Sequence, residues 1–289
     1  MSIYIVIDAL LDGLKDTALS VPILFVTYLF MEILEGSQRM NEKVLCHYSR
    51  KVGPVIGGLL GVIPQCGISG AAATLYSTGT ITLGTMLAVF FATSDEMLPV
   101  MLSSLTSQFS IGIGTIVMIM AGKAVLGVIL GYITDVIVKI STGKNIHSFC
   151  EREHCECDEE EGSVFVAALV HTLKIAVMLL IVNIGLTLVI ESIGIEALSG
   201  TILNQPIIGE ILTGLFGLIP NCSISIILTE SYLTGVLGIG GLFSGLLSNA
   251  GIGLIVLFRS NRSMKENFTI VGIMLLLSVI SGIIINLIF

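Results

Sequence analysis

Apolar stretches separated by short polar segments run along the whole chain, and they fall into two sets of five. A hydrocarbon core of about 30 Å needs about 20 apolar helical residues, so the longer stretches predict membrane-spanning helices. The second and third stretches of each set are too short to span, because thirteen helical residues rise only about 20 Å. The pattern predicts an all-α polytopic membrane protein, with stretches at 18–35, 53–64, 66–79, 81–103, 110–138, 164–190, 207–219, 222–233, 236–257 and 268–289.

Each pair of short stretches meets at a Pro-x-Cys turn, which is Ile63-Pro64-Gln65-Cys66 in the first half and Ile219-Pro220-Asn221-Cys222 in the second. With one proline placed on the other, residues 57–96 and 213–252 align without a gap and share Pro, Cys, Ser, Tyr and Gly positions. Proline breaks a helix and frees backbone groups, so a turn at membrane depth needs protein or water around it. We therefore expect a broken-helix hairpin in each repeat, as is typical of secondary transporters.

The basic residues predict that the two repeats are inverted. Lys and Arg are frequent in 36–52 and 258–267 but absent from the repeat counterparts of these loops, 191–206 and 104–109. The positive-inside rule places the basic loops, together with 139–163, in the cytoplasm and both termini outside. Equivalent loops then lie on opposite faces of the membrane, so we expect an in-plane pseudo-two-fold axis.

Composition agrees with this organisation and narrows the function. Charged residues make up 12% of the chain, against about 25% in soluble domains, so the lipid bilayer is the expected environment and the cytoplasmic membrane the expected location. The net charge of −8 argues against nucleic acid as a partner. Nothing resembles a phosphate-binding loop and no soluble domain could hydrolyse ATP, so we expect a non-enzyme that ion or proton exchange drives and that could form a homodimer. The expected domains are repeat 1 (1–141), a cytoplasmic loop (142–163) and repeat 2 (164–289).

The two turns supply the first candidate substrate ligands. Unwound backbone at mid-membrane offers carbonyls, N–H groups and helix dipole ends to a substrate. Each turn adds a soft thiol and an amide, and a serine follows one helical turn later. The alternative is that both cysteines are small buried apolar residues and the prolines only kink the chain. The candidates are Gln65, Cys66, Ser69, Asn221, Cys222 and Ser225.

Charged residues inside apolar stretches are the second group of candidates. Asp95 and Glu96 lie within 81–103, where ionised carboxylates are costly and mark an ion path. Asn249 occupies nearly the same depth in the second repeat, and Glu230 lies in the 222–233 half-helix. Lys123, in the middle of 110–138, predicts an acidic partner, Asp95 or Glu96. That pair would be either a proton-coupling device or a fixed ion pair.

The loop that joins the repeats is rich in metal-ligating side chains. Its N, S and O donors suit divalent transition metals, but it lacks the paired Cys-x-x-Cys spacing of a rigid zinc site. We expect a loose metal-collecting loop, with a solvated acidic linker as the alternative and no other cofactor required. Its candidate ligands are His147, Cys150, His154, Cys155, Cys157 and Asp158.

Taken together, these motifs resemble the ten-helix heavy-metal exporter family, whose members are labelled arsenic efflux proteins or manganese transporters and are distantly similar to arsenical permeases. The resemblance rests on the Gly-x-Ile-Pro-x-Cys turns, Gly61–Cys66 and Gly217–Cys222, and on the central loop. It implies a ten-segment membrane architecture and export. Related permeases carry further cysteines around the first turn, whereas Gly67 follows Cys66 here, which argues against a three-thiolate arsenite site.

Three functions are compatible with the sequence. The leading hypothesis is proton- or ion-coupled export of a metal or metalloid ion bound between the two Pro-x-Cys turns. The second is a transmembrane thiol–disulfide reductant conduit that uses Cys66 and Cys222. The third is an exporter of a small organic solute, with the central loop only a linker. Buried carboxylates and a metal-rich loop are not needed for electron transfer, and they favour transport.

Overall fold

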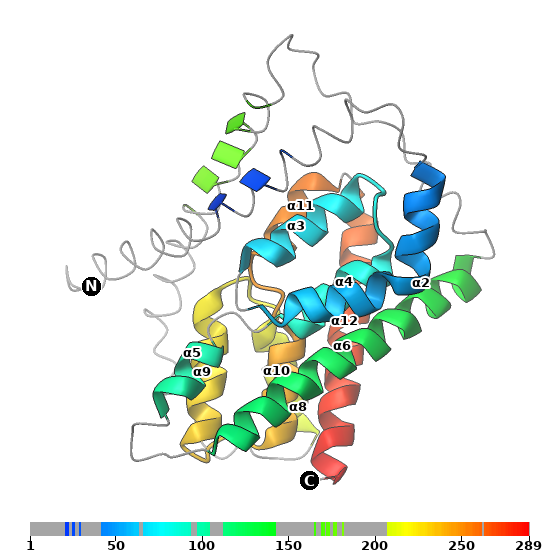
Figure 1. Ribbon diagram of the computed structural model, residues 1–289. Helices are drawn as coiled ribbons and strands as arrows, with labels where there is room; N and C mark the ends of the chain where they lie inside the picture. The colour runs from blue at the N-terminus through cyan, green and yellow to red at the C-terminus, as the bar shows by residue number, and fades with distance from the viewer. Residues whose placement is uncertain are drawn as a thin grey trace.

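The computed structural model is helical throughout the part of the chain that it describes (Figure 1). It describes six continuous ranges and a few single residues within 21–29 and 165–181. The main described ranges are 42–63, 66–93, 97–104, 112–142, 207–261 and 263–288.

The two halves of the chain fold into matching series of helices. The first series is α2 (Glu42–Gly61), α3 (Cys66–Ser77), α4 (Leu83–Ala92), α5 (Met97–Ser104) and α6 (Ile113–Thr142). The second series is α8 (Ile208–Gly217), α9 (Cys222–Leu233), α10 (Ile239–Ser248), α11 (Ile252–Ser260) and α12 (Met264–Ile288). Equivalent helices of the two series, such as α3 and α9 or α4 and α10, begin and end at the same spacing along the chain.

The predicted division into long and short apolar elements is confirmed for the described residues. Four apolar stretches are long enough to cross a membrane, namely Leu83–Leu102, Ile113–Val138, Ile239–Ser260 and Met264–Ile288. The apolar helices Val52–Gly61, Ile208–Gly217 and Ile224–Leu233 are shorter. The short helices end or begin beside the Pro-x-Cys turns, as the proline positions predict.

Two boundaries differ from the sequence prediction. Helix α2 starts at Glu42, inside the expected loop 36–52, because hydropathy marks the membrane-buried part of a helix and not its polar extension. The stretches 81–103 and 236–257, each expected as one continuous segment, are broken between α4 and α5 and between α10 and α11. Gly251, with φ of 52°, starts α11 in a conformation that glycine adopts without steric cost.

Helices α3 and α9 end in the same glycine-capped turn. Gly79 and Gly235 have φ of 78° and 76°, which L side chains rarely adopt. The following N–H groups return to the last helical turn, from Thr80 to the Leu75 carbonyl at 2.9 Å and from Val236 to the Ser231 carbonyl at 3.0 Å. These bonds satisfy carbonyls that a helix end leaves free, and they turn the chain back into α4 and α10.

Within each half, one short helix packs between two neighbours through glycines. Helix α4 contacts α2 and α6, and α10 contacts α8 and α12. A β-carbon on Gly131 would lie 2.6 Å from the Gly84 carbonyl oxygen, and one on Gly282 would lie 2.6 Å from the Gly240 carbonyl oxygen. Such close backbone approach at small residues is a general way of packing helices in membranes, where burial from water supplies no drive.

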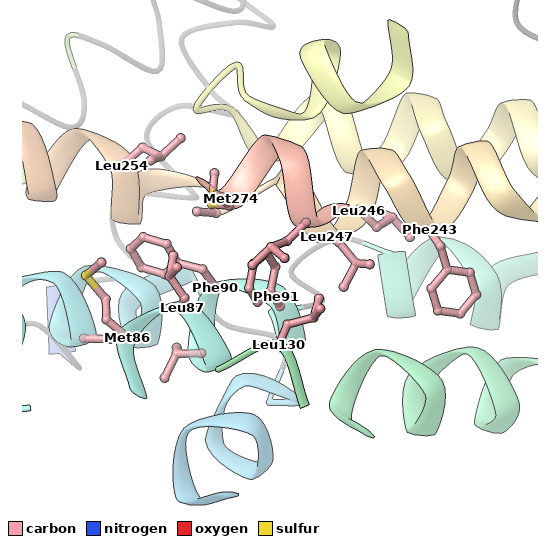
Figure 2. Close-up of a cluster of buried hydrophobic side chains, with 14 of the residues drawn as sticks. Met86, Leu87, Phe90, Phe91, Leu130, Phe243, Leu246, Leu247, Leu254 and Met274 are labelled. Atoms are coloured by element: carbon pink, nitrogen blue, oxygen red, sulfur yellow. The ribbon is translucent and has the colours of Figure 1, made fainter. Parts of the chain in front are cut away.

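The two halves meet in a central apolar core. Phe90 and Phe91 of α4 lie with Leu246 and Leu247 of α10 in one buried cluster (Figure 2). Helix α3 packs on α11, and α5 packs on α9. Short helices of the first half therefore contact short helices of the second half at two places. In Figure 1 the α3–α11 pair lies in the upper part of the molecule and the α5–α9 pair in the lower part. The equivalent helices α3 and α9 therefore lie in different parts of the fold, whereas α4 and α10 meet at its centre.

Candidate functional site

The end of α2 lies against the end of α4 in the first half. A β-carbon on Gly61, three residues before Pro64, would come within 2.7 Å of the Ala92 β-carbon and of the Val89 carbonyl oxygen. Only glycine permits this approach. The last residue of α2 is thereby adjacent to the last turn of α4.

The second half repeats this arrangement. A β-carbon on Gly217 would overlap the Gly245 carbonyl oxygen and Ser248 Oγ, so the end of α8 lies against the end of α10. Gly217 occupies the position in its half that Gly61 occupies in the first. The end of α8 and the end of α10 are therefore also neighbours.

A cross-half contact joins the two pairs of breaks. A β-carbon on Gly253, in the first turn of α11, would lie 2.9 Å from the Ser69 β-carbon and 2.7 Å from Phe90 Cε1. Ser69 belongs to the first turn of α3, and Phe90 to the last turn of α4. The start of α3, the end of α4 and the start of α11 thus meet at one place inside the molecule.

Four of the predicted site residues are buried at these helix ends. Ser69 and Ser225 lie in the first turns of α3 and α9, Asn221 directly precedes α9, and Asn249 directly follows α10. The Asn249 side-chain oxygen accepts the Gly251 N–H at 3.0 Å. Buried polar groups are costly unless they are hydrogen-bonded, so their concentration at the breaks is the main polar feature of the described interior.

Lys123 of α6 is also at a break. Its side chain is fully buried, and the ammonium group donates a hydrogen bond to the Thr93 carbonyl, the first carbonyl after α4. Thr93 occupies the position in the first half that Asn249 occupies in the second. The expected carboxylate partners, Asp95 and Glu96, lie outside the described residues, so the predicted pairing stays a prediction.

Glu230 is not brought to the breaks. It is exposed on α9, about two turns beyond Cys222, which corresponds to roughly 12 Å along the helix axis. The backbone carbonyl of Glu230 accepts the Thr234 N–H at 2.9 Å and so belongs to the end of α9.

Several predicted ligands fall outside what the structure describes. Cys66 and Cys222 are described only as the first residues of α3 and α9. In the described residues, no three His, Cys, Asp or Glu side chains gather closely enough to hold a metal ion. The predicted residues outside the description are Gln65, Asp95, Glu96, His147, Cys150, His154, Cys155, Cys157 and Asp158.

One carboxylate in each half, half-buried Asp135 and buried Glu210, holds a helix start and was not singled out by sequence reasoning. Asp135 of α6 accepts the Gly84 N–H at 2.8 Å and the Thr82 hydroxyl at 2.9 Å, at the start of α4. Glu210 of α8 accepts the Ile207 N–H at 2.6 Å. The available signal was the rarity of acidic residues in apolar stretches, combined with the preference of helix starts for negative charge.

Comparison with known proteins gives one result. No curated protein and no solved structure significantly matches the chain. A family model matches residues 2–203, which include α2 to α6 and end before α8. Because this match covers more than half of the chain, the chain belongs to the family described as "Putative, 10TM heavy-metal exporter".

Proposed function

We propose that the chain is a secondary exporter that carries a metal or metalloid ion out of the cytoplasm through a site between its helix breaks. Two observations carry this proposal: Ser69 in the first turn of α3 lies against Gly253 at the start of α11, and Asn221, Ser225 and Asn249 are buried at helix ends of the second half. Broken helices at membrane depth expose backbone groups to a substrate, and transporters use them in this way. Export is a property of the family, and the proposal adds the site and its coupling.

The two halves act, in this proposal, as inverted repeats. Support comes from the matched helices, from the equivalent contacts of α3 with α11 and of α9 with α5, and from the central contact of α4 with α10. Equivalent helices α3 and α9 lie at different ends of the fold (Figure 1), which is the arrangement that an axis through the α4–α10 contact would give. Such a site becomes accessible from either face when one repeat moves against the other.

The proposed ligands combine soft and hard donors. Cys66 and Cys222 begin α3 and α9, where the positive end of the helix dipole favours a negatively charged group. Thiolates bind soft metals and metalloids, whereas amide, carbonyl and carboxylate oxygens bind harder cations. Asp95, which follows α4 within three residues, supplies a charge at which a cation and a proton would compete. That competition would couple export to proton entry.

The location and the central loop complete the proposal. Loops 36–52, 139–163 and 258–267 would face the cytoplasm of a multi-pass protein in the cytoplasmic membrane. The donors between His147 and Asp158 would then collect divalent metal on the side from which export starts.

Transport by everted membrane vesicles tests the proposal. Vesicles with the wild-type protein should accumulate at least one of Mn²⁺, Zn²⁺ and arsenite, and should do so only with a proton gradient. Asp95→Asn, Cys66→Ser and Cys222→Ser should each slow this accumulation. Cys46→Ser is the matched control, because it removes a thiol of α2 that lies far along the chain from the turn. Wild-type rates in all three site variants would refute the proposed site.

A further inference from the structure

The two halves hold their second helix break in different ways. After α10 the break is held locally, because Asn249 Oδ1 accepts the Gly251 N–H at 3.0 Å. After α4 the break is held from another helix, because Lys123 of α6 donates to the Thr93 carbonyl. The residue of α12 that corresponds to Lys123 by repeat spacing is apolar, so this cation belongs to the first half alone.

The carbonyl end of a helix is a favourable place for an ammonium group. The carbonyl end of α4 carries the negative end of the helix dipole. Lys123 is fully buried, so its ammonium group has no direct access to water. Polar groups of the protein must therefore stabilise its charge. A hydrogen bond to a charged donor is stronger than a neutral one, which makes the Thr93 carbonyl a specific anchor.

Backbone packing fixes the place from which Lys123 reaches the break. One turn further along α6, a β-carbon on Gly127 would lie 2.9 Å from the Ala88 carbonyl oxygen and 3.2 Å from the Ala92 β-carbon. Helices α4 and α6 are therefore in close backbone contact directly beside Lys123. The position of the ammonium group is set by this contact and not by the flexible side chain alone.

The charged groups around Lys123 are few in the described structure. Helices α2, α4, α5 and α10 pack on α6. Of these, α4, α5 and α10 contain no ionisable side chain, and the ionisable residues of α2 lie in its first half, Glu42–Lys51. Asp135, on α6 itself, is three turns away and bonded to the start of α4. Asp95 and Glu96 lie outside the described residues.

We infer that Lys123 is a positioning residue that remains protonated through the transport cycle and fixes the geometry of the break after α4. It holds the carbonyl end of α4 against α6. Its role in transport rests on the proposed function, but its role in holding the break does not. The proton that drives export is then exchanged elsewhere in the site.

Substitution of Lys123 by arginine distinguishes a positioning role from a role in carrying the proton. The guanidinium of arginine is always protonated in proteins and still donates hydrogen bonds. Lys123→Arg should keep proton-driven uptake into everted vesicles, within about threefold of wild type. Lys123→Gln should raise KM for the transported ion roughly tenfold or more, as expected for loss of one charge-assisted bond. Thr134→Val is the matched control, because it removes a buried hydroxyl that bonds within α6, to the Leu130 carbonyl.

Hydrogen exchange of the purified protein tests the break without any transport. Amides 93–97 should exchange faster in Lys123→Gln than in wild type, and at the wild-type rate in Lys123→Arg and Thr134→Val. Normal exchange in Lys123→Gln would overturn the positioning role. A folded Lys123→Arg protein that moves ions without a proton requirement would show that Lys123 carries the proton. Absence of ion uptake by the wild-type protein would refute the proposed function and leave the exchange result standing.

Discussion

At the scale of single residues, several polar side chains of the described helices bond to helix ends. Asp135 bonds the start of α4, Lys123 bonds its end, and Asn249 bonds across the break after α10. Burying a charge or an amide in an apolar interior costs free energy. Hydrogen bonds to the backbone groups at helix ends offset part of that cost. The same groups thus stabilise the ends of the broken helices.

Asp135 provides a test at this scale. Asp135→Asn should lower the free energy of unfolding by about 1–3 kcal/mol, because a charge-assisted bond to the Gly84 N–H becomes a neutral one. Asp135→Glu keeps the charge and should lose less. Thermal unfolding in detergent measures both. Equal stability of wild type and Asp135→Asn would mean that this carboxylate does not hold α4.

At the scale of helices, glycines set which helices can touch. The contacts of α4 with α6, of α10 with α12 and of α3 with α11 all depend on a position where a β-carbon would collide with a neighbour. Small residues give membrane helices this close approach. The breaks are adjacent because these glycines let the helix ends come together.

Gly253 provides a test of the joint between the halves. Gly253→Ala would place a methyl group 2.9 Å from the Ser69 β-carbon, so α11 and α3 would have to separate. Overpacking of this kind costs about 1–3 kcal/mol, and ion uptake should fall with it. Gly272→Ala on α12 is the control, because nothing lies within 4 Å of its added carbon. Similar uptake and unfolding temperatures in both variants would contradict a tight joint here.

The loop 142–163 provides another test at the scale of segments. Its donors lack fixed spacing, so we expect weak metal capture and no part in the transport path. A variant with residues 147–161 replaced by a Gly/Ser linker of equal length should show an altered KM for Mn²⁺ or Zn²⁺ and a nearly unchanged maximal rate of vesicle uptake. Complete loss of uptake in a well-inserted variant would assign the loop to the path.

At the scale of the whole molecule, repetition made most of the architecture predictable. The starts of α3 and α9 follow from Pro64 and Pro220, because proline ends a helix locally. The breaks after Ala92 and Ser248 were missed, because apolar residues lie on both sides of each break and the hydropathy pattern does not change there. Thr93 and Glu96 have the spacing of a capping box before an apolar run, which was an available signal.

The partners of the site residues were less predictable than their burial. The predicted pairing of Lys123 with Asp95 or Glu96 stays a prediction, because both carboxylates lie outside the described residues. The hydrogen bond from Lys123 to the Thr93 carbonyl at the end of α4 was not expected from the sequence. Such a contact depends on how α4 and α6 pack against each other, and the pattern of apolar and polar residues does not determine the distance between these two helices. Asn249, in contrast, was predictable, since its partner Gly251 is two residues away.

Cross-linking of the two turns tests the central claim most directly. In a variant that keeps Cys66 and Cys222 but has serine at positions 46, 150, 155 and 157, a short bifunctional thiol reagent should join the two cysteines within one chain. Prior addition of the ion that wild-type vesicles accumulate should slow the reaction, because both thiols would then be ligands of one ion. A folded variant that forms no cross-link, or forms it at the same rate with and without the ion, would contradict a shared site between the two turns.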